Sequence, residues 1–185
     1  MMKDCVIIQH EFPPGTLINI KEIPFIILSY SKEYPSMIKV ISERSIWQES
    51  FGDNSTWESS ALRKSLRKGL MHERVKSVFG ANRMYYFFRD ISPIDRSDTN
   101  SVIDSISLLT LEEYSKYKYI FERHRTNEKW WLLTPRSTAY GGDDKSVFCV
   151  NQSGLVDFQL CGFKAGVRPV IVTDISVISE SEIIK

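Results

Sequence analysis

The chain has few cysteines. Of its 185 residues only three, Cys5, Cys149 and Cys161, are cysteine. Their number and irregular spacing do not fit the disulfide framework that small secreted domains use. We interpret Cys149 and Cys161 as reduced thiols that pack as small apolar groups, although neighbouring strands would also allow the two to pair.

Long apolar runs are also absent. The N-terminal run Val6–Ile8 is too short for a signal peptide, and no stretch approaches the ~20 apolar residues that a membrane-spanning helix needs. We therefore expect a cytoplasmic protein with no membrane partner.

The chain lacks an excess of charge of either sign. Its 24 basic and 23 acidic side chains leave a formal net charge of +1. Such a balance creates no global field that would draw the protein to nucleic acid or to an anionic membrane. Any electrostatic partner must therefore recognise a local patch.

Catalytic signatures are missing as well. The three histidines, His10, His72 and His124, lie in no recognisable motif, and the chain has no Gly-x-Ser-x-Gly, phosphate-cradling glycine loop or Cys-x-x-Cys. The segment 141–144 (Gly-Gly-Asp-Asp) offers oxygen ligands, but it supplies few of the about six to eight that calcium takes, which favours a solvated turn. We predict no catalytic residue, no cofactor and no metal, and expect a binding protein rather than an enzyme.

The chain does contain local patterns that predict helices and strands. Ser55 with Glu58, and Thr110 with Glu113, have the spacing of a capping box, which predicts one helix from Ser55 to about Leu70 and another ending near Arg123. Strands are predicted at 23–30, 37–41, 84–88, 146–151, 156–160 and 167–173.

This order predicts an α+β fold in which two helices are inserted between β-rich ends. We expect a single domain over residues 1–174. The remaining segment, 175–185, is a tail that either adds an edge strand or frays.

The most distinctive segments are Trp130–Pro135 and Gly166–Val170. Since neighbouring side chains of a strand face opposite ways, one of the two tryptophans should enter the core while the other faces outward; the alternative is that both are core. We assign Trp130 to the core and Trp131 to a candidate surface. The predicted structural residues are Trp57, Trp130, Gly166, Arg168 and Pro169.

Arg168 lies in an otherwise apolar strand. Burying an unpaired guanidinium is costly, so we expect a paired side chain. An anionic ligand is the alternative partner. The acidic partners that we consider are Asp104, Glu112, Glu113 and Asp157.

Five motifs in order resemble an uncharacterised family of bacterial and phage-associated domains of unknown function. They include the signatures Trp-Trp-Leu-x-Ser/Thr-Pro and Gly-Val-Arg-Pro. The matching stretches, over most of residues 20–173, are Trp57 with Ser60, Leu62 and Arg63; residues 108–113; Trp130–Pro135; Val150 and Asn151 with Gly154; and Gly166–Val170.

That family is similar to the C-type-lectin-like fold of formylglycine-generating enzymes and of the variable proteins of diversity-generating retroelements. The resemblance implies small mixed or antiparallel sheets, a final Gly-x-Arg strand that closes one of them, and loops that present a ligand surface. Leu133 stands where the family usually has arginine. The polar group expected beside the tryptophan pair is therefore missing.

Our leading hypothesis is a non-catalytic domain that binds a protein or small ligand through its C-terminal loops. Aromatic and adaptable polar side chains on exposed segments are typical of recognition surfaces. The candidate ligand-binding residues are Trp131, Arg136, Tyr140, Asp143, Asp144, Gln152, Asp157, Gln159 and Lys164.

Two other classes stay open. One is a nucleic-acid-associated phage or defence accessory protein, because basic side chains gather on the first predicted helix and just after it. The other is a degenerate relative of the formylglycine-generating enzymes, in which Cys149 and Cys161 lie in the comparable third of the chain. The basic residues are Arg63, Lys64, Arg67, Lys68, Arg74 and Lys76.

Overall fold

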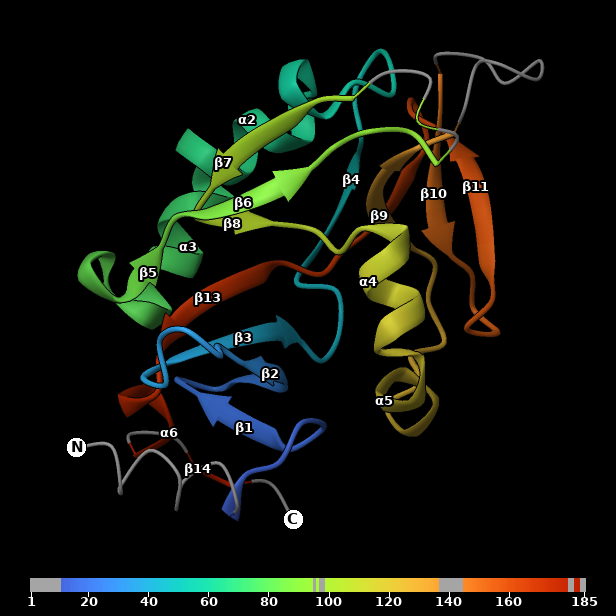
Figure 1. The fold of residues 1–185 in the computed structure, drawn as a ribbon. Coiled ribbons are helices and arrows are strands. Elements are labelled where there is room, and N and C mark those ends of the chain that lie inside the picture. Colours follow the sequence, from blue (N-terminus) through green and yellow to red (C-terminus); the bar gives the residue numbers. More distant parts are fainter. Residues whose placement is uncertain (1–10, 95, 97–98, 137–144, 180–181, 184–185) are drawn as a thin grey trace.

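The computed structural model describes residues 11–94, 96, 99–136, 145–179 and 182–183 (Figure 1). Within these ranges the fold is α+β, as predicted: two sheets and a two-stranded ribbon are accompanied by short helices. No helix of the described chain is long and apolar enough to cross a membrane.

The first sheet is antiparallel and has the order β14-β1-β2-β3-β13-β5, with β8 also paired to β13. The late strand β13 lies inside this sheet, because β3 pairs with one side of it and β8 and β5 pair with the other. The strands are β1 (Leu17–Ile20), β2 (Ile23–Tyr30), β3 (Met37–Ser42), β5 (Met84–Tyr85), β8 (Ile106–Ser107), β13 (Val170–Asp174) and β14 (Glu182–Ile183).

The second sheet has the order β11-β10-β9-β12-β4. Its pairings are antiparallel except for β12 with β9, where Gly166 lies beside Trp130 in parallel. A separate ribbon pairs β6 with β7. These strands are β4 (Trp47–Ser50), β6 (Phe87–Asp90), β7 (Ser101–Asp104), β9 (Trp130–Pro135), β10 (Ser146–Val150), β11 (Val156–Leu160) and β12 (Lys164–Val167).

The chain crosses from the second sheet to the first at Arg168 and Pro169. The prediction of one strand over 167–173 is wrong, since β12 ends at Val167 and β13 begins at Val170. Proline has no N–H to donate to a ladder, and the Pro169 carbonyl instead accepts from the Ser42 N–H at 3.2 Å.

Gly166 allows two backbones to approach at this crossing. A Cβ at this position would lie 1.9 Å from the Ser45 Oγ and 3.0 Å from the Lys129 carbonyl oxygen. Both distances are too short for a side chain, so the close approach requires glycine.

The first predicted helix begins later and ends earlier than expected. A 3₁₀ turn (η1, Trp57–Ser59) comes first, and Ser60, not Ser55, caps α2 (Ala61–Lys68) by accepting from the Arg63 N–H at 3.0 Å. Gly69 then separates α2 from α3 (Leu70–Phe79), which leaves Leu70 89% exposed instead of on the buried face. A short 3₁₀ turn, η2 (Ala81–Arg83), follows.

The second predicted helix forms as two short helices, α4 (Leu111–Lys116) and α5 (Lys118–Arg123), which end at the expected residue. The capping box is confirmed. Thr110 Oγ1 accepts from the Glu113 N–H at 3.1 Å, and a Glu113 carboxylate oxygen accepts from the Thr110 N–H at 3.0 Å.

The predicted strand 84–88 is divided in two. β5 pairs with β13 in the first sheet, whereas β6 pairs with β7, so Tyr86 lies between strands with different partners. Past residue 174 the described chain forms α6 (Ser176–Ser179) and then β14, which pairs with β1 at the end of the first sheet.

The core has two apolar clusters, and the two adjacent tryptophans enter different ones. Trp131 packs in the larger cluster with side chains of α2 and α3, and Trp130 packs in the smaller one with Tyr114, Ile120 and Phe121 of α4 and α5. The period-2 alternation of β9 therefore places one tryptophan on each face of the second sheet, and both faces are covered there.

Candidate functional site

Strand β11 carries a row of exposed apolar side chains. Val156, Phe158 and Leu160 are 42%, 46% and 45% exposed, and they alternate with the half-buried Asp157 and Gln159. Since successive side chains of a strand face opposite ways, the three lie on one face of the sheet. We call Val156, Phe158 and Leu160 the β11 stripe.

The stripe is exposed because the helices cover only part of this sheet face. Phe158 lies opposite Phe148 of β10, which is half-buried against the cluster that α4 and α5 complete. Figure 1 shows α4 and α5 beside the second sheet, with β11 at its outer edge, on the far side of β10. The apolar side chains of β11 therefore continue the apolar face of the second sheet beyond the part that α4 and α5 cover.

The stripe residues also carry the outward-facing backbone groups of this edge strand. The β10–β11 hairpin is flanked by the Asn151 N–H bonded to the Leu155 carbonyl and by the Cys161 N–H bonded to the Lys145 carbonyl. Along an antiparallel strand, residues that bond to the partner strand alternate with residues that do not. Since Leu155 and Cys161 bond to β10 or its flanks, the residues between them that do not are Val156, Phe158 and Leu160, and their N–H and C=O groups turn away from β10. One of these N–H groups, that of Phe158, donates to an Asp157 carboxylate oxygen at 2.8 Å.

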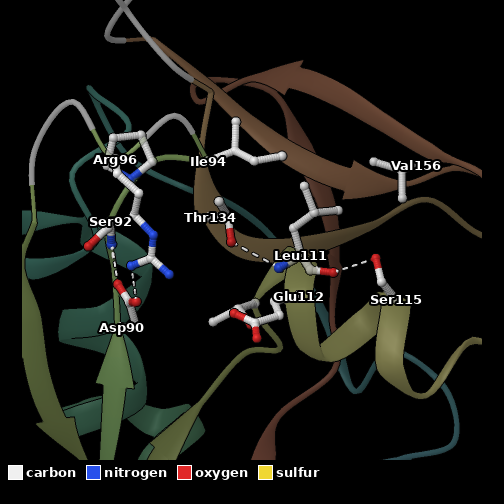
Figure 2. Close-up of a pocket in the computed structure, with 11 residues that line it drawn as sticks. Asp90, Ser92, Ile94, Arg96, Leu111, Glu112, Ser115, Thr134 and Val156 are labelled. Carbon is white, nitrogen blue, oxygen red and sulfur yellow. Dashed lines mark hydrogen bonds and ion pairs between the residues drawn. The ribbon is translucent and has the colours of Figure 1, made fainter.

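A pocket of about 520 Å³ adjoins one end of the stripe (Figure 2). Ile94 and Arg96 approach from the segment after β6, and Leu111 and Ser115 from α4, while Thr134 of β9 and Val156 of β11 contribute the part of the wall that belongs to the sheet. The lining residues are Asp90, Ser92, Pro93, Ile94, Arg96, Thr110, Leu111, Glu112, Ser115, Thr134 and Val156.

Two of the charged side chains that line this pocket form an ion pair with each other. Asp90 forms an ion pair with Arg96 and accepts from the Ser92 N–H at 2.9 Å. Partial burial alone would raise the pKa of Asp90, but the bonds from Ser92 and the charge of Arg96 hold it below its ordinary value. The pocket is therefore a largely apolar recess whose polar wall contains this ion pair and the exposed carboxylate of Glu112.

Glu113 fixes the wall that α4 provides. Its carboxylate accepts from both Nη atoms of Arg89 at 2.8 and 2.6 Å and from Lys39 Nζ at 2.8 Å. Burial opposes the charge on this carboxylate, but the bonds and charges of Arg89 and Lys39 prevail and lower the pKa of Glu113 to about 2. This cluster joins α4 to β3 and β6.

Trp131 is not a surface residue. It is fully buried, and its Nε1–H donates to the Glu49 carbonyl at 2.8 Å. The prediction that it presents a ligand platform is wrong, because Phe51 and the η1 turn pack on that face of β9 and a backbone carbonyl accepts from its only donor.

Three of the predicted ligand residues lie on or beside β11. The guanidinium of Arg136 stacks 4.1 Å from the centre of the Phe158 ring. Gln159 accepts from Lys129 Nζ at 2.9 Å, and Asp157 lies 4.0 Å from the same nitrogen. Asp157 and Gln159 therefore face away from the stripe, toward Lys129.

The other predicted ligand residues are dispersed or lie outside the described chain. Gln152 is exposed in the β10–β11 turn, and Lys164 is exposed on β12, where it pairs with Ser50 of β4. Tyr140, Asp143 and Asp144 are outside the described residues.

The basic face predicted for nucleic acid loses one member. Arg63 is buried, and its Nε and Nη2 each lie 2.9 Å from Asp104 Oδ1, so its charge is neutralised inside the fold. Lys76 lies 3.8 Å from Glu73, and Arg74 stacks over Trp47 at 5.7 Å. The remaining members, exposed on α2, are Lys64, Arg67 and Lys68.

The cysteine hypothesis gains no support from the geometry. Cys149 and Cys161 are both buried, and no disulfide joins them. Burial raises the pKa of Cys149 to about 11, and a buried protonated thiol is a poor nucleophile. Among the described residues no group of His, Cys, Asp or Glu could hold a metal ion.

The expectation of an acidic partner for Arg168 is wrong. Asp104 pairs with Arg63 and Glu113 with Arg89, while Arg168 Nε donates to the Ser42 carbonyl at 3.0 Å. The guanidinium lies over the rings of Trp130 and Phe121, at 4.6 and 5.1 Å from their centres.

Sequence reasoning missed the apolar members of this surface. The strand 156–160 and its alternation were readable, but alternation gives two faces without saying which one is covered. The polar side chains Asp157 and Gln159 were assigned to the surface, whereas Val156, Phe158 and Leu160 are the more exposed set.

Comparison of the chain with protein-family models, with curated proteins and with solved structures finds no match.

Proposed function

We propose that this protein is a non-catalytic recognition domain that binds an extended segment of a partner protein along the outer edge of β11. The observation that carries the proposal is the coincidence of exposed apolar side chains and outward backbone groups on the same three residues. An incoming strand pairs with the backbone of an edge and places every second side chain against one face.

Side-chain chemistry defines the partner. The stripe is apolar, Arg136 stacks on Phe158, and the adjoining pocket is largely apolar, with the Asp90–Arg96 ion pair and the exposed Glu112 at its wall. The complementary segment has an apolar residue at every second position, one of which enters the pocket beside Val156. Exposed apolar side chains on an edge strand are typical of interaction sites, because soluble proteins otherwise protect such edges.

Selection from a displayed library of short linear peptides tests this proposal. We expect the selected peptides to alternate apolar and polar residues and to perturb the amide resonances of β11. Phe158→Ser should lower the affinity for these peptides about thirtyfold, which corresponds to the loss of about 2 kcal/mol of binding free energy at one central residue. Phe88→Ser is the matched control, since Phe88 is 67% exposed on β6, away from the stripe.

A backbone substitution separates strand pairing from simple apolar contact. Val156→Pro removes an outward N–H at the first residue of an edge strand, where proline is tolerated. If the peptide pairs with the backbone of β11, Val156→Pro should bind the selected peptides more weakly while its Tm is unchanged. Peptides without alternation, or binding that survives both Phe158→Ser and Val156→Pro, would refute the proposal.

We further propose that the α+β fold is C-type-lectin-like and belongs with the uncharacterised family that its motifs resemble. The position of the Gly166–Pro169 segment supports this, because it links the two sheets and is followed by the interior strand β13. An experimental structure tests it: superposition on formylglycine-generating enzymes should match the β9, β12 and β13 connections, and a different connectivity would reject the assignment.

A further inference from the structure

Arg168 lacks a carboxylate partner although it is almost completely buried. It is 1% exposed, its Nε is bonded to a backbone carbonyl, and its Nη2 has no hydrogen-bond partner among the described residues. Burial lowers the pKa of Arg168 to about 10, against the opposing influence of Glu128 and Glu43. Distant carboxylates therefore leave this charge incompletely balanced.

The guanidinium faces a small cavity. The cavity is lined by Arg168 together with Trp130 and Phe121, the two rings on which the guanidinium lies. The centres of water-sized spheres can occupy about 10 Å³ of it, so it has room for one small group. An unpaired donor, a positive charge and a space for one small group therefore coincide.

The rest of the lining is positive or neutral. Arg125 is exposed at the cavity, and His124 donates from Nε2 to the Gly15 carbonyl at 2.9 Å. The Tyr114 hydroxyl donates to the Gly154 carbonyl at 2.6 Å, which ties α4 to the β10–β11 turn. None of the described lining residues is Asp or Glu.

We propose that this cavity binds a single halide-sized anion, which Arg168 holds from the core and Arg125 from the surface. Such an anion would place a negative charge in the cavity, where none of the described lining residues provides one, and would accept from Arg168 Nη2. It would also join the end of α5, the β10–β11 turn and the start of β13, since these segments meet at the cavity. The site is independent of the proposed binding at the β11 stripe.

Thermal unfolding in sodium chloride and in sodium gluconate at equal ionic strength tests the site. Gluconate is too large for the cavity, so chloride should raise the Tm in a saturable way, by about 4 °C at about ten times its dissociation constant. Arg168→Met should abolish the difference. Equal Tm values in the two salts, or a chloride response that persists in Arg168→Met, would mean that only water occupies the cavity.

A second variant keeps the test valid if Arg168→Met does not fold. Arg125→Ala removes the surface cation and should weaken chloride about threefold to fivefold. Arg123→Ala is the matched control, because Arg123 is exposed at the end of α5, two residues before Arg125, but does not line the cavity. The ³⁵Cl line width provides a direct readout: the protein should broaden it, less so in Arg125→Ala, and an unaltered response in this variant would reject the site.

Discussion

Two regions of this molecule bury an arginine beside a tryptophan, but they neutralise it differently. In the first region, at α2, the carboxylate of Asp104 accepts from Arg63 and also from Trp57 Nε1 at 2.9 Å. In the second region, at α5, Arg168 lies on the ring of Trp130 and has only a backbone carbonyl as its hydrogen-bond partner among the described residues. The first charge is part of a closed network, whereas the second depends on aromatic faces and, in our proposal, on a bound anion.

This difference shows that burial alone does not reveal what an arginine does. A paired guanidinium is a cross-link whose partner cannot be removed without stranding a charge. An arginine without a carboxylate strands no opposite charge when it is replaced. The two regions therefore predict different responses to substitution.

Removing the carboxylate from the first region should have the largest effect. Asp104→Asn keeps the size of the side chain but leaves the buried Arg63 uncompensated, so we expect the free energy of unfolding to fall by about 3–5 kcal/mol. Urea denaturation measures it. Glu73→Gln is the control, because this exposed carboxylate lies 3.8 Å from Lys76 and should cost under about 0.5 kcal/mol. A loss as small for Asp104→Asn would contradict the closed network.

Acid should break a second buried ion pair, that of Arg89 with Glu113. The pKa of Glu113 is lowered from 4.5 to about 2, so its contribution is complete above about 4.5 and is lost as the pH falls toward 2. The difference corresponds to about 3 kcal/mol. Urea denaturation at a series of pH values should show this loss, and Glu113→Gln should remove it from that window.

The neighbouring Glu112 provides the control for this pH dependence. It is exposed in the same turn of α4, so Glu112→Gln should retain the acid-induced loss. The same pH profile in Glu113→Gln and in the unmodified protein would assign the effect to other carboxylates.

Replacing the arginines themselves should separate the two regions. Arg63→Met strands the buried Asp104 and should cost about 3–5 kcal/mol. Arg168→Met strands no carboxylate and keeps most of the packing on Trp130, so we expect about 1–2 kcal/mol in gluconate. Urea denaturation of both variants gives the comparison, and equal costs would show that Arg168 has an internal anionic partner after all.

The smallest effect on stability is expected at the β11 stripe. Phe158 is 46% exposed and stacks with Arg136, so Phe158→Ser should lower the free energy of unfolding by only about 0.5–1 kcal/mol. Phe148→Ser, on the strand beside it, should cost at least about 1 kcal/mol because Phe148 packs against the core. Urea denaturation checks both. A large loss in Phe158→Ser would make the stripe part of the core rather than a binding surface.

The sequence by itself determined the features that depend on near neighbours. The capping box at Thr110, the helical segment that ends at Arg123 and the strand 156–160 with its alternation all follow from interactions within a few residues. The predicted bounds of the first helix were wrong for a local reason that is also present in the sequence: Ser60 competes with Ser55 as the N-cap, and Gly69 ends the helix early.

Only the tertiary structure decided which faces are covered and which charges meet. Trp131 is buried because Phe51 and the η1 turn pack over its face of β9, and Arg63 is internal because β7 brings Asp104 to it. Both contacts join segments distant in sequence, where neither alternation nor charge counting specifies a partner. For the same reason alternation alone did not show that Val156, Phe158 and Leu160 form the more exposed face of β11: α4 and α5 lie beside the sheet but leave this edge strand uncovered.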